Sequence, residues 1–201
     1  LLTLGLWPDW FAPPQPDWPP SIRTTGFVRY DAPGEHAPPE GLDAFLAAGE
    51  PPVVFTPGTA MQLGERFFAA AVDASQRLGR RAILLTPHRA QLPPQLPPGI
   101  AHFDYVPFSD VLPRVAAVVH HGGIGTLAQA LAAGTPQLVM PMAHDQPDNA
   151  RRVKALGVGD WIPPGRFTGA RVARRLGALL ASEPVARRAA ALAPRVDFDA
   201  G

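Results

Sequence analysis

The chain contains no cysteine, and its apolar runs are short. The absence of cysteine excludes disulfide bonds, thiolate catalysis and metal sites held by cysteine. It is compatible with a reducing compartment, so we expect a cytoplasmic protein. No apolar run approaches the roughly 18 residues that a membrane-spanning helix needs. The first residue is Leu1 rather than methionine, and no basic residues precede the apolar stretch at 1–6. We therefore expect no signal peptide and interpret the chain as a piece of a longer protein.

The chain also lacks an excess of charge and a cluster of metal ligands. Its formal net charge is +1, and its arginines are scattered singly or in pairs. Nucleic-acid-binding proteins concentrate basic residues in a patch, so we expect no nucleic-acid partner. His36, His88 and His102 have no neighbours at metal-ligand spacing, so we interpret them as structural and expect no metal site. The 201 residues suffice for one sizeable domain.

Proline is abundant in two segments that precede the regular part of the chain. Residues 7–20 contain six prolines and three tryptophans, and residues 31–41 form a second segment rich in proline and glycine. Because proline fixes φ and lacks an amide donor, residues 7–20 are expected to form an extended connector. Exposed indoles would be costly, so we expect the tryptophans to lie on a surface shared with a domain absent from this chain. We interpret residues 1–50 as an interdomain linker and lead-in, and 51–201 as the folded domain.

From residue 52 onward, short apolar runs alternate with helical patterns. Such alternation predicts an α/β fold with a Rossmann-like, doubly wound parallel sheet. A further helical pattern begins near Thr126 and is closed by Gly134 and Pro136, and Thr168 is the expected N-cap of a later helix. We predict strands at 52–55, 82–85, 100–105, 116–119, 137–140 and 158–162, and helices at 42–48, 64–78, 110–113, 148–156, 168–180 and 185–192.

The stretch at 116–149 carries the strongest functional pattern. A strand is followed by His120, His121 and a glycine turn containing Gly122, Gly123 and Gly125, and then by a helix. The first amides of a helix lack partners and lie at the positive end of its dipole, so this turn is a candidate phosphate site, with the hydroxyl of Thr126 as a further donor. Two adjacent histidines in an extended segment point to opposite faces, so at most one faces a ligand. The alternative is a tight structural turn with satisfied histidines.

The same residues also match a dinucleotide-binding pattern. Gly123, Gly125 and Ala128 satisfy G-x-G-x-x-A, and Asp145 follows Gly123 by 22 residues. That acid normally ends the next strand, whereas here a loop separates Met140 from Asp145. An NAD-dependent oxidoreductase therefore stays as an alternative.

Further polar and aromatic residues follow the predicted strands. Asp145 and Gln146 are suited to hydrogen-bonding sugar hydroxyls, or to capping the helix in which Pro147 lies near the first turn. Tyr105, followed by Val106, is either a ring that stacks on a base or a buried strand end. Thr59, after the turn that ends the first strand, is a candidate N-cap or second phosphate contact.

Residues 120–159 resemble the donor-binding signature of family 1 glycosyltransferases of GT-B fold. Their sequence is HHGGIGTLAQALAAGTPQLVMPMAHDQPDNARRVKALGVG. The form it resembles is the bacterial one, related to macrolide, sterol and rhamnolipid glycosyltransferases. The resemblance covers nearly all of the chain, because three further stretches occur in the order that the family has. These are DW-PP-S-I-TG, FLAAGEPPVVFTPGTA and YVPFSDVLPRVAAVVHHGGIGT. It implies the C-terminal, donor-binding half of a GT-B fold.

The resemblance implies a role for each residue that matches the family's motif. The donor diphosphate would contact His121, with amides and hydroxyls from Gly122, Gly123, Gly125, Thr126 and Thr59. Asp145 and Gln146 would bind the transferred sugar, a hexose or 6-deoxyhexose. Tyr105 falls where plant members have a tryptophan that stacks on uracil, and Val106 where a backbone group contacts the base edge. Gln129 replaces a glutamate that binds the ribose and Phe108 replaces a glutamine, so UDP and dTDP both stay open.

The resemblance also implies what this chain does not supply. The N-terminal acceptor domain would provide a histidine base for an inverting displacement, so no catalytic residue is expected here, and neither a cofactor nor a metal. A lipid acceptor would bring peripheral membrane contact. We expect the isolated chain to bind the nucleotide-sugar donor without transferring sugar. A GT-B nucleotide-sugar epimerase is the alternative of related fold.

Overall fold

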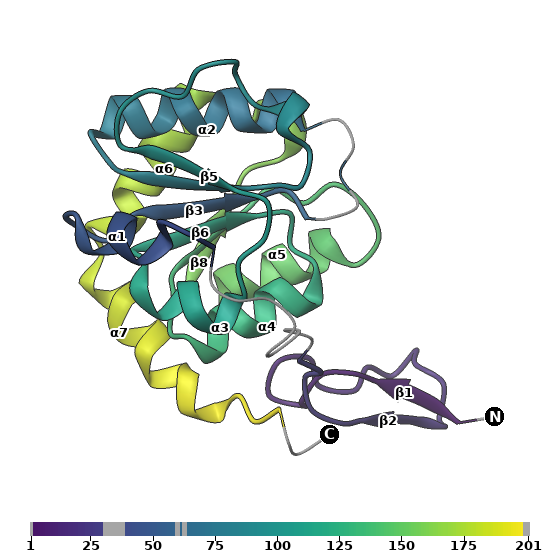
Figure 1. Ribbon diagram of the computed structural model, residues 1–201. Helices are drawn as coiled ribbons and strands as arrows, with labels where there is room; N and C mark the ends of the chain where they lie inside the picture. The colour runs from purple at the N-terminus through teal and green to yellow at the C-terminus, as the bar shows by residue number, and fades with distance from the viewer. Residues whose placement is uncertain (1, 30–38, 59–60, 62–63, 199–201) are drawn as a thin grey trace.

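The computed structural model describes residues 2–29, 39–58, 61 and 64–198. Its main feature is a parallel sheet of six strands in the order β5-β4-β3-β6-β7-β8 (Figure 1). The central strands are buried on both faces, as their continuous apolar sequences predict. The doubly wound parallel sheet is therefore confirmed. Its strands are β3 (Val53–Thr56), β4 (Ala82–Leu85), β5 (Ile100–Phe103), β6 (Ala117–His120), β7 (Gln137–Val139) and β8 (Gly159–Trp161).

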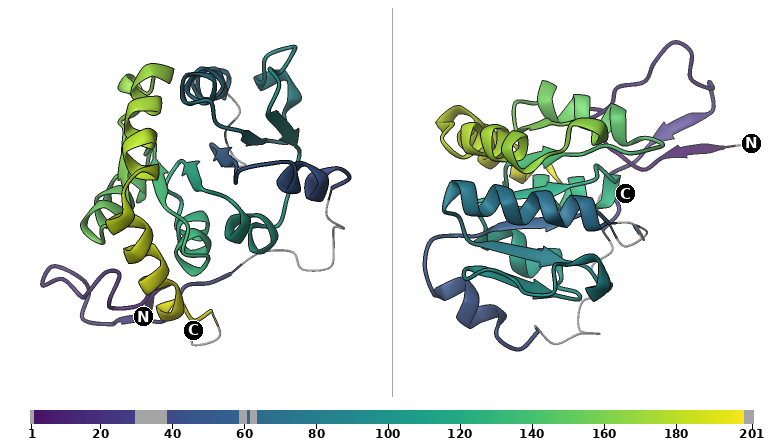
Figure 2. Two further views of the ribbon diagram at one scale, coloured as in Figure 1. Left: turned by 90° about the vertical axis from the view of Figure 1, so that its left-hand side faces the viewer. Right: turned by 90° about the horizontal axis from the view of Figure 1, so that it is seen from above.

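Helices cover both faces of this sheet (Figures 1 and 2). On one face, α2 and α6 pack together over Phe55, Leu84 and Leu138. On the other, α1, α3, α4, α5 and α7 cover side chains such as Val54 and Val118. The helices are α1 (Leu42–Ala47), α2 (Glu65–Leu78), α3 (Phe108–Val111), α4 (Ile124–Ala132), α5 (Gln146–Ala155), α6 (Gly169–Leu180) and α7 (Glu183–Leu192), with 3-10 turns η1 (Arg89–Gln91), η2 (Leu112–Arg114), η3 (Pro164–Arg166) and η4 (Ala193–Arg195).

The chain order creates a switch point between β3 and β6. From β3 the chain proceeds outward to β4 and β5, then returns to β6 on the other side of β3 and proceeds outward to β7 and β8. The last paired residues of β3 and β6 are Thr56 and His120. In open α/β sheets, ligands bind beyond the carboxyl ends of the strands at such a switch point.

Several element boundaries differ from the sequence-based expectations. The strand expected at 100–105 ends at Phe103, and the short helix expected at 110–113 begins at Phe108 because Pro107, with φ of −53°, occupies its N-cap position. The helix expected from 148 begins at Gln146, with Pro147 in its first turn. Thr168 does occupy the N-cap position of α6, but its side chain makes no capping hydrogen bond.

The lead-in segment packs on the domain. It contains two short strands that the sequence analysis did not predict, β1 (Thr3–Gly5) and β2 (Ile22–Thr24). These strands pair with each other in parallel (Figure 1). Its tryptophans are half-buried rather than lying free on the surface, in a cluster that includes the fully buried Phe27. The guanidinium of Arg195 lies 4.7 Å from the ring of Trp10. Much of this segment is therefore joined to the domain by apolar and cation–π contacts.

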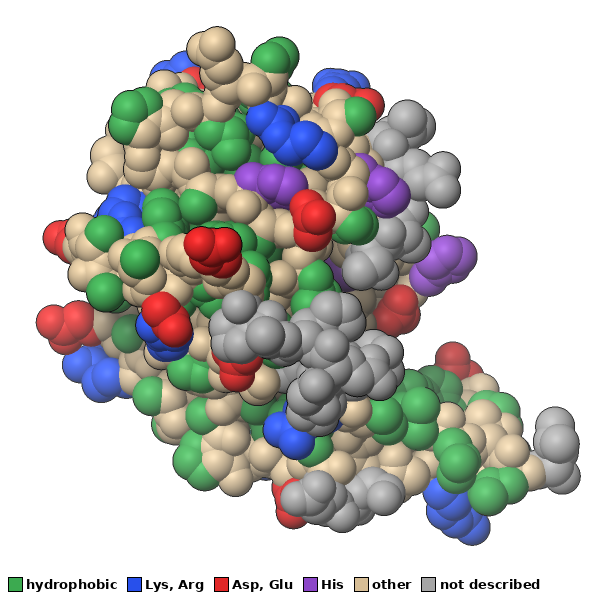
Figure 3. Space-filling model, viewed as in Figure 1, with side chains coloured by type: hydrophobic (Ala, Val, Ile, Leu, Met, Phe, Trp, Pro, Cys, Tyr) green, Lys and Arg blue, Asp and Glu red, His purple; other side chains and the backbone are tan. Residues whose placement is uncertain are grey.

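The distribution of surface charge and the character of the helices follow from the near-neutral composition and the short apolar runs. On the face shown in Figure 3, Lys and Arg side chains are dispersed among acidic ones rather than gathered in one patch. Within the described ranges, none of the helices combines the length and the apolar character needed to cross a bilayer.

Candidate functional site

The turn between β6 and α4 has a backbone that requires glycine. Gly122 has φ of 92°, a left-handed conformation that side chains disfavour, and a Cβ on it would lie 2.7 Å from Cγ1 of Val139. Gly123 is extended and forms the N-cap position of α4 without a side chain. The first amides of α4 therefore have no capping side chain, and they lie at the positive end of the helix dipole.

The ring of His121 is packed closely against two glycines. A Cβ on Gly58 would lie 2.7 Å from Cε1 of His121, and a Cβ on Gly123 would lie 2.4 Å from Nε2. The Nδ1 atom is buried and has no hydrogen-bond partner among the described residues. Burial lowers the pKa of His121, and the charge of Asp145 opposes this shift. His121 is thus a neutral, tightly oriented imidazole with one unsatisfied nitrogen, which favours a ligand with polar atoms at this place.

His120 points to the opposite face and is fully buried. Its Nδ1 accepts the amide proton of Gly122 at 3.1 Å, which places its own proton on Nε2 for donation to Oε1 of Gln137 at 3.0 Å. Burial, followed by the charge of His121, lowers the pKa of His120 to about 3. Of the two histidines, only His121 faces the larger cavity, which agrees with the prediction that at most one of them faces a ligand. His120 supports the turn from the opposite side.

Two adjoining cavities lie at the carboxyl ends of the strands. One of about 460 Å³ is lined by His121, by the start of α4 and by the loop that follows β7. The other, of about 330 Å³, is lined by the segment that follows β5, including Tyr105 and Val106. Both are of the size that small-molecule sites have, and they adjoin at shared residues, so one elongated ligand can span them. The shared residues are Thr56, Gly58, Phe108, Gly125 and Thr126.

Most of the residues expected at the site line these two cavities. The larger cavity contains His121, Gly123, Gly125, Thr126 and Gln146, and the smaller one contains Tyr105, Val106 and Gln129 together with Gly125 and Thr126. Gly122 lies in the turn but lines neither cavity, and its amide and carbonyl groups are bound by His120 and Asn149. Thr59 lies outside the described residues, as does His36.

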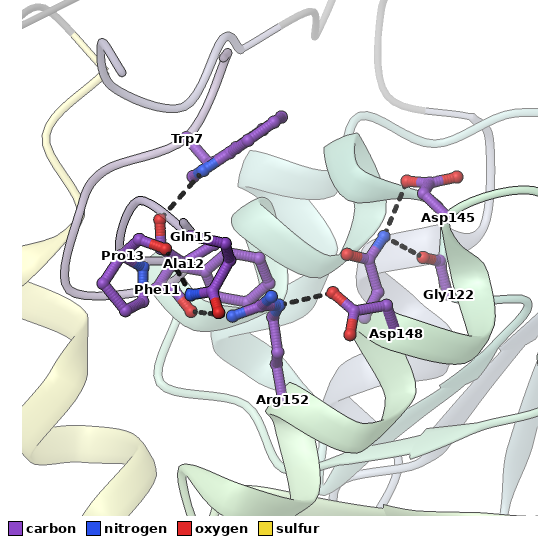
Figure 4. A network of polar contacts seen from close by, with 10 residues as sticks. Trp7, Phe11, Ala12, Pro13, Gln15, Gly122, Asp145, Asp148 and Arg152 are labelled. Atoms are coloured by element: carbon purple, nitrogen blue, oxygen red, sulfur yellow. Dashed lines mark hydrogen bonds and ion pairs between the residues drawn. The ribbon is translucent and has the colours of Figure 1, made fainter. Parts of the chain in front are cut away.

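Asp145 and Gln146 diverge in the structure. The side-chain carbonyl of Gln146 accepts the amides of Met142 and Ala143 at 2.9 and 3.1 Å, so its NH₂ group is what it offers a ligand. Asp145 does not line the cavity of Gln146, but a neighbouring one of about 360 Å³ between α5 and the lead-in segment. Asp145 does not cap α5 through its side chain, and its carboxylate accepts a hydrogen bond from Asn149 at 2.7 Å instead (Figure 4).

Sequence reasoning missed several cleft residues. Thr86 directly follows β4, so the rule that ligands bind at carboxyl strand ends would have found it. Val28 belongs to the lead-in segment, and no local pattern indicates that it lines the smaller cavity. His144 lines the larger cavity with φ of 55°, a conformation rarely adopted by residues with side chains and concentrated at functional sites. In the described part of the chain, no three His, Asp or Glu side chains form a group that would hold a metal ion.

Comparison with known proteins places the chain in a family. Residues 71–197 match the family described as erythromycin biosynthesis protein CIII-like, C-terminal domain. Over 192 residues, 94% of this chain and 44% of the relative, the sequence is 34% identical to O-mycaminosyltylonolide 6-deoxyallosyltransferase of Streptomyces fradiae. Over 150 residues, 74% of this chain and 35% of the relative, it is 38% identical to the vancomycin aglycone glucosyltransferase of Amycolatopsis orientalis.

The solved structures give the same result for the fold. The glycosyltransferase VinC, crystallised in complex with dTDP, superposes with a TM-score of 0.79 at 26% sequence identity, covering 98% of this chain and 48% of VinC. The chain spans about half the length, or less, of the relatives that it matches. It belongs to the family of erythromycin biosynthesis protein CIII-like C-terminal domains, with the fold of the C-terminal half of GT-B glycosyltransferases.

Proposed function

We propose that this chain is the donor-binding half of a glycosyltransferase that transfers a hexose or 6-deoxyhexose from a UDP- or dTDP-sugar to a hydroxyl of a small-molecule or lipid acceptor. The observation that carries the proposal is His121, whose unsatisfied imidazole lies between Gly58 and Gly123 beside the N-terminus of α4. A neutral donor and a row of helix amides suit an anion such as a diphosphate.

The diphosphate would lie in the larger cavity. The amides at the start of α4 and the hydroxyl of Thr126 would donate to its oxygens, with Gly123 and Gly125 permitting close approach. Negative charge grows on the diphosphate as the sugar leaves, so these groups and His121 would stabilise the transition state more than the ground state. The family resemblance adds Thr59 to this set.

The nucleoside would lie in the smaller cavity. Tyr105 is 37% exposed and lines this cavity, and its ring would stack on the base. Val106 is buried, which favours a contact through its backbone rather than its side chain. Gln129 lies one helical turn after Gly125 on α4 and is a candidate for the ribose hydroxyls. None of these three contacts distinguishes uracil from thymine, so UDP and dTDP are both candidates for the nucleotide of the donor.

The sugar would lie near Gln146, with Asp145 at the edge of the neighbouring cavity. One amide and one carboxylate provide donors and acceptors of the kind that sugar hydroxyls need. A preceding N-terminal half would contain the acceptor domain and supply the histidine base for the inverting step. Residues 1–50 would link that half to the donor-binding domain at 51–201. We also propose that the protein is cytoplasmic and has no nucleic-acid partner. Its contact with a membrane would occur only through a lipid acceptor.

Calorimetric titration of this chain with UDP, dTDP and NAD tests the proposal. One of the pyrimidine nucleotides should bind, and His121→Ala should weaken that binding about tenfold, as expected for a lost hydrogen bond to a charged group. The matched control is His88→Ala, an exposed histidine outside both cavities. Binding of NAD alone would overturn the proposal in favour of a dinucleotide enzyme, and equal losses in both variants would remove His121 from the site.

A further inference from the structure

Asn149 makes two hydrogen bonds with one side-chain nitrogen. It lies in α5, is 5% exposed, and its Nδ2 donates to the carbonyl oxygen of Gly122 at 2.9 Å and to Oδ2 of Asp145 at 2.7 Å. Figure 4 shows the two dashed lines that run from this one nitrogen to Gly122 and to Asp145. Both partners are acceptors, so only the amide nitrogen of Asn149 can occupy this position.

Gly122 is also bound on its other side. Its amide proton is accepted by Nδ1 of His120, while Asn149 donates to its carbonyl oxygen. The chain of hydrogen bonds therefore runs from Gln137 on β7 through His120 and Gly122 to Asn149 and Asp145. In a buried, low-dielectric setting such connected bonds orient one another, so a displacement at one end is felt at the other.

We propose that Asn149 is a positioning residue that couples the glycine turn to Asp145. The inference rests on the proposed function, in which the turn binds the diphosphate and Asp145 the sugar. A residue that only stabilised α5 would need no bond to Gly122, which lies 27 positions earlier in the chain. Through the shared nitrogen, the carboxylate that binds the sugar is aligned with the amides that bind the leaving diphosphate.

Asn149→Leu tests this coupling because leucine is close in size and has no donor. We expect it to weaken dTDP binding roughly two- to tenfold, the range for one lost hydrogen bond. We also expect it to change the ratio of the dissociation constants for dTDP and dTDP-glucose, or for the UDP pair if the chain prefers UDP. In an Asp145→Ala background, Asn149→Leu should still weaken dTDP binding but leave that ratio unchanged. Asp148→Asn is the control, since Asp148 is the preceding residue on α5 and its carboxylate accepts a hydrogen bond from Nε of Arg152 at 2.6 Å.

The outcomes separate the two proposals. No binding of any nucleotide by the unmodified chain overturns the proposed function, and the coupling with it. Binding by the unmodified chain with the same fold loss for dTDP and dTDP-glucose in Asn149→Leu overturns the coupling alone, because a purely structural defect reduces the folded fraction for both ligands equally.

A ligand-free measurement checks the same coupling. Asp145→Asn should shift the backbone amide NMR signals of Gly122 and Gly123 in the otherwise unmodified chain and should shift them less in an Asn149→Leu background, where only the charge effect of Asp145 on His121 is left. Shifts of equal size in both backgrounds would show that Asp145 reaches the turn without Asn149. Thermal unfolding of each variant establishes that it is folded at the temperature of the experiment.

Discussion

Nε2 of His120 lies 3.0 Å from Oε1 of Gln137 on the neighbouring strand, and both side chains are completely buried. Burial lowers the pKa of His120 from 6.5 to about 3. Between pH 6.5 and pH 3 this histidine is therefore protonated in the unfolded state and neutral in the native state. The stability that neutral His120 provides is therefore complete above pH 6.5 and is lost as pH falls towards 3. The linked free energy is on the order of a few kcal/mol.

His120→Asn should flatten the fall in stability between pH 7 and pH 4. Asparagine can still accept the amide proton of Gly122 but does not titrate, so the remaining slope comes from other groups. Urea unfolding at pH 7, 5.5 and 4 measures the effect, with His88→Asn as the exposed control. A slope in His120→Asn as steep as in the unmodified chain would show that protonation of His120 does not govern acid sensitivity.

Gly58→Ala should weaken nucleotide binding and lower stability by about 1–3 kcal/mol. Gly58 has φ of 89°, and the added Cβ would lie 2.7 Å from the ring of His121, which would have to move. Gly165→Ala is the matched control, because a Cβ there meets nothing within 4 Å and its change in stability should stay within about 0.5 kcal/mol. Unfolding curves and dTDP titration measure both effects. Unchanged affinity in Gly58→Ala would mean that the orientation of His121 is unimportant.

Phe27→Ala should cost about 3–5 kcal/mol, the usual range for removing a buried aromatic ring. Phe27 is 1% exposed and its ring centroid lies 5.2 Å from that of Phe11, so it anchors the lead-in segment to the domain. The adjacent Val28 is 55% exposed, and Val28→Ala should change stability by about 0.5 kcal/mol at most. Equal stabilities of the two variants in chemical denaturation would mean that this segment is only a connector.

The isolated chain should bind donor without transferring sugar. Under the proposed function the base and the acceptor pocket would belong to a preceding half, and the chain covers only 44% of its Streptomyces fradiae relative. Incubation with dTDP-glucose or UDP-glucose and a panel of acceptors bearing free hydroxyls, followed by mass spectrometry, should detect no glycosylated product. Product formation by this chain alone would place a catalytic base within it.

The sequence predicted the central unit well because the information there is local. The apolar run of β6, the glycines after it and the helical period of α4 all lie within one short stretch. The turn, and the opposite directions of His120 and His121, therefore followed from local pattern alone. Contacts between distant segments were not predictable in this way. The bond from Asn149 to Gly122 depends on how α5 packs against β6, and the pairing of β1 with β2 depends on a loop whose prolines indicated only an absence of regular structure. Thr168 has the residue type and position of a cap, but its hydroxyl does not make the bond.

At the switch point between β3 and β6, the strands that support the two cavities are distinct from the loops that line them. The ladder that ends at Thr56 and His120 fixes where the surrounding loops leave the sheet, while residues 143–145 of the loop after β7 are exposed and lie outside the core. For protein engineering, this arrangement favours exchange of the 141–145 loop between relatives as a way to alter ligand preference. The sheet would tolerate such grafts because their two attachment points, the end of β7 and the start of α5, keep their places.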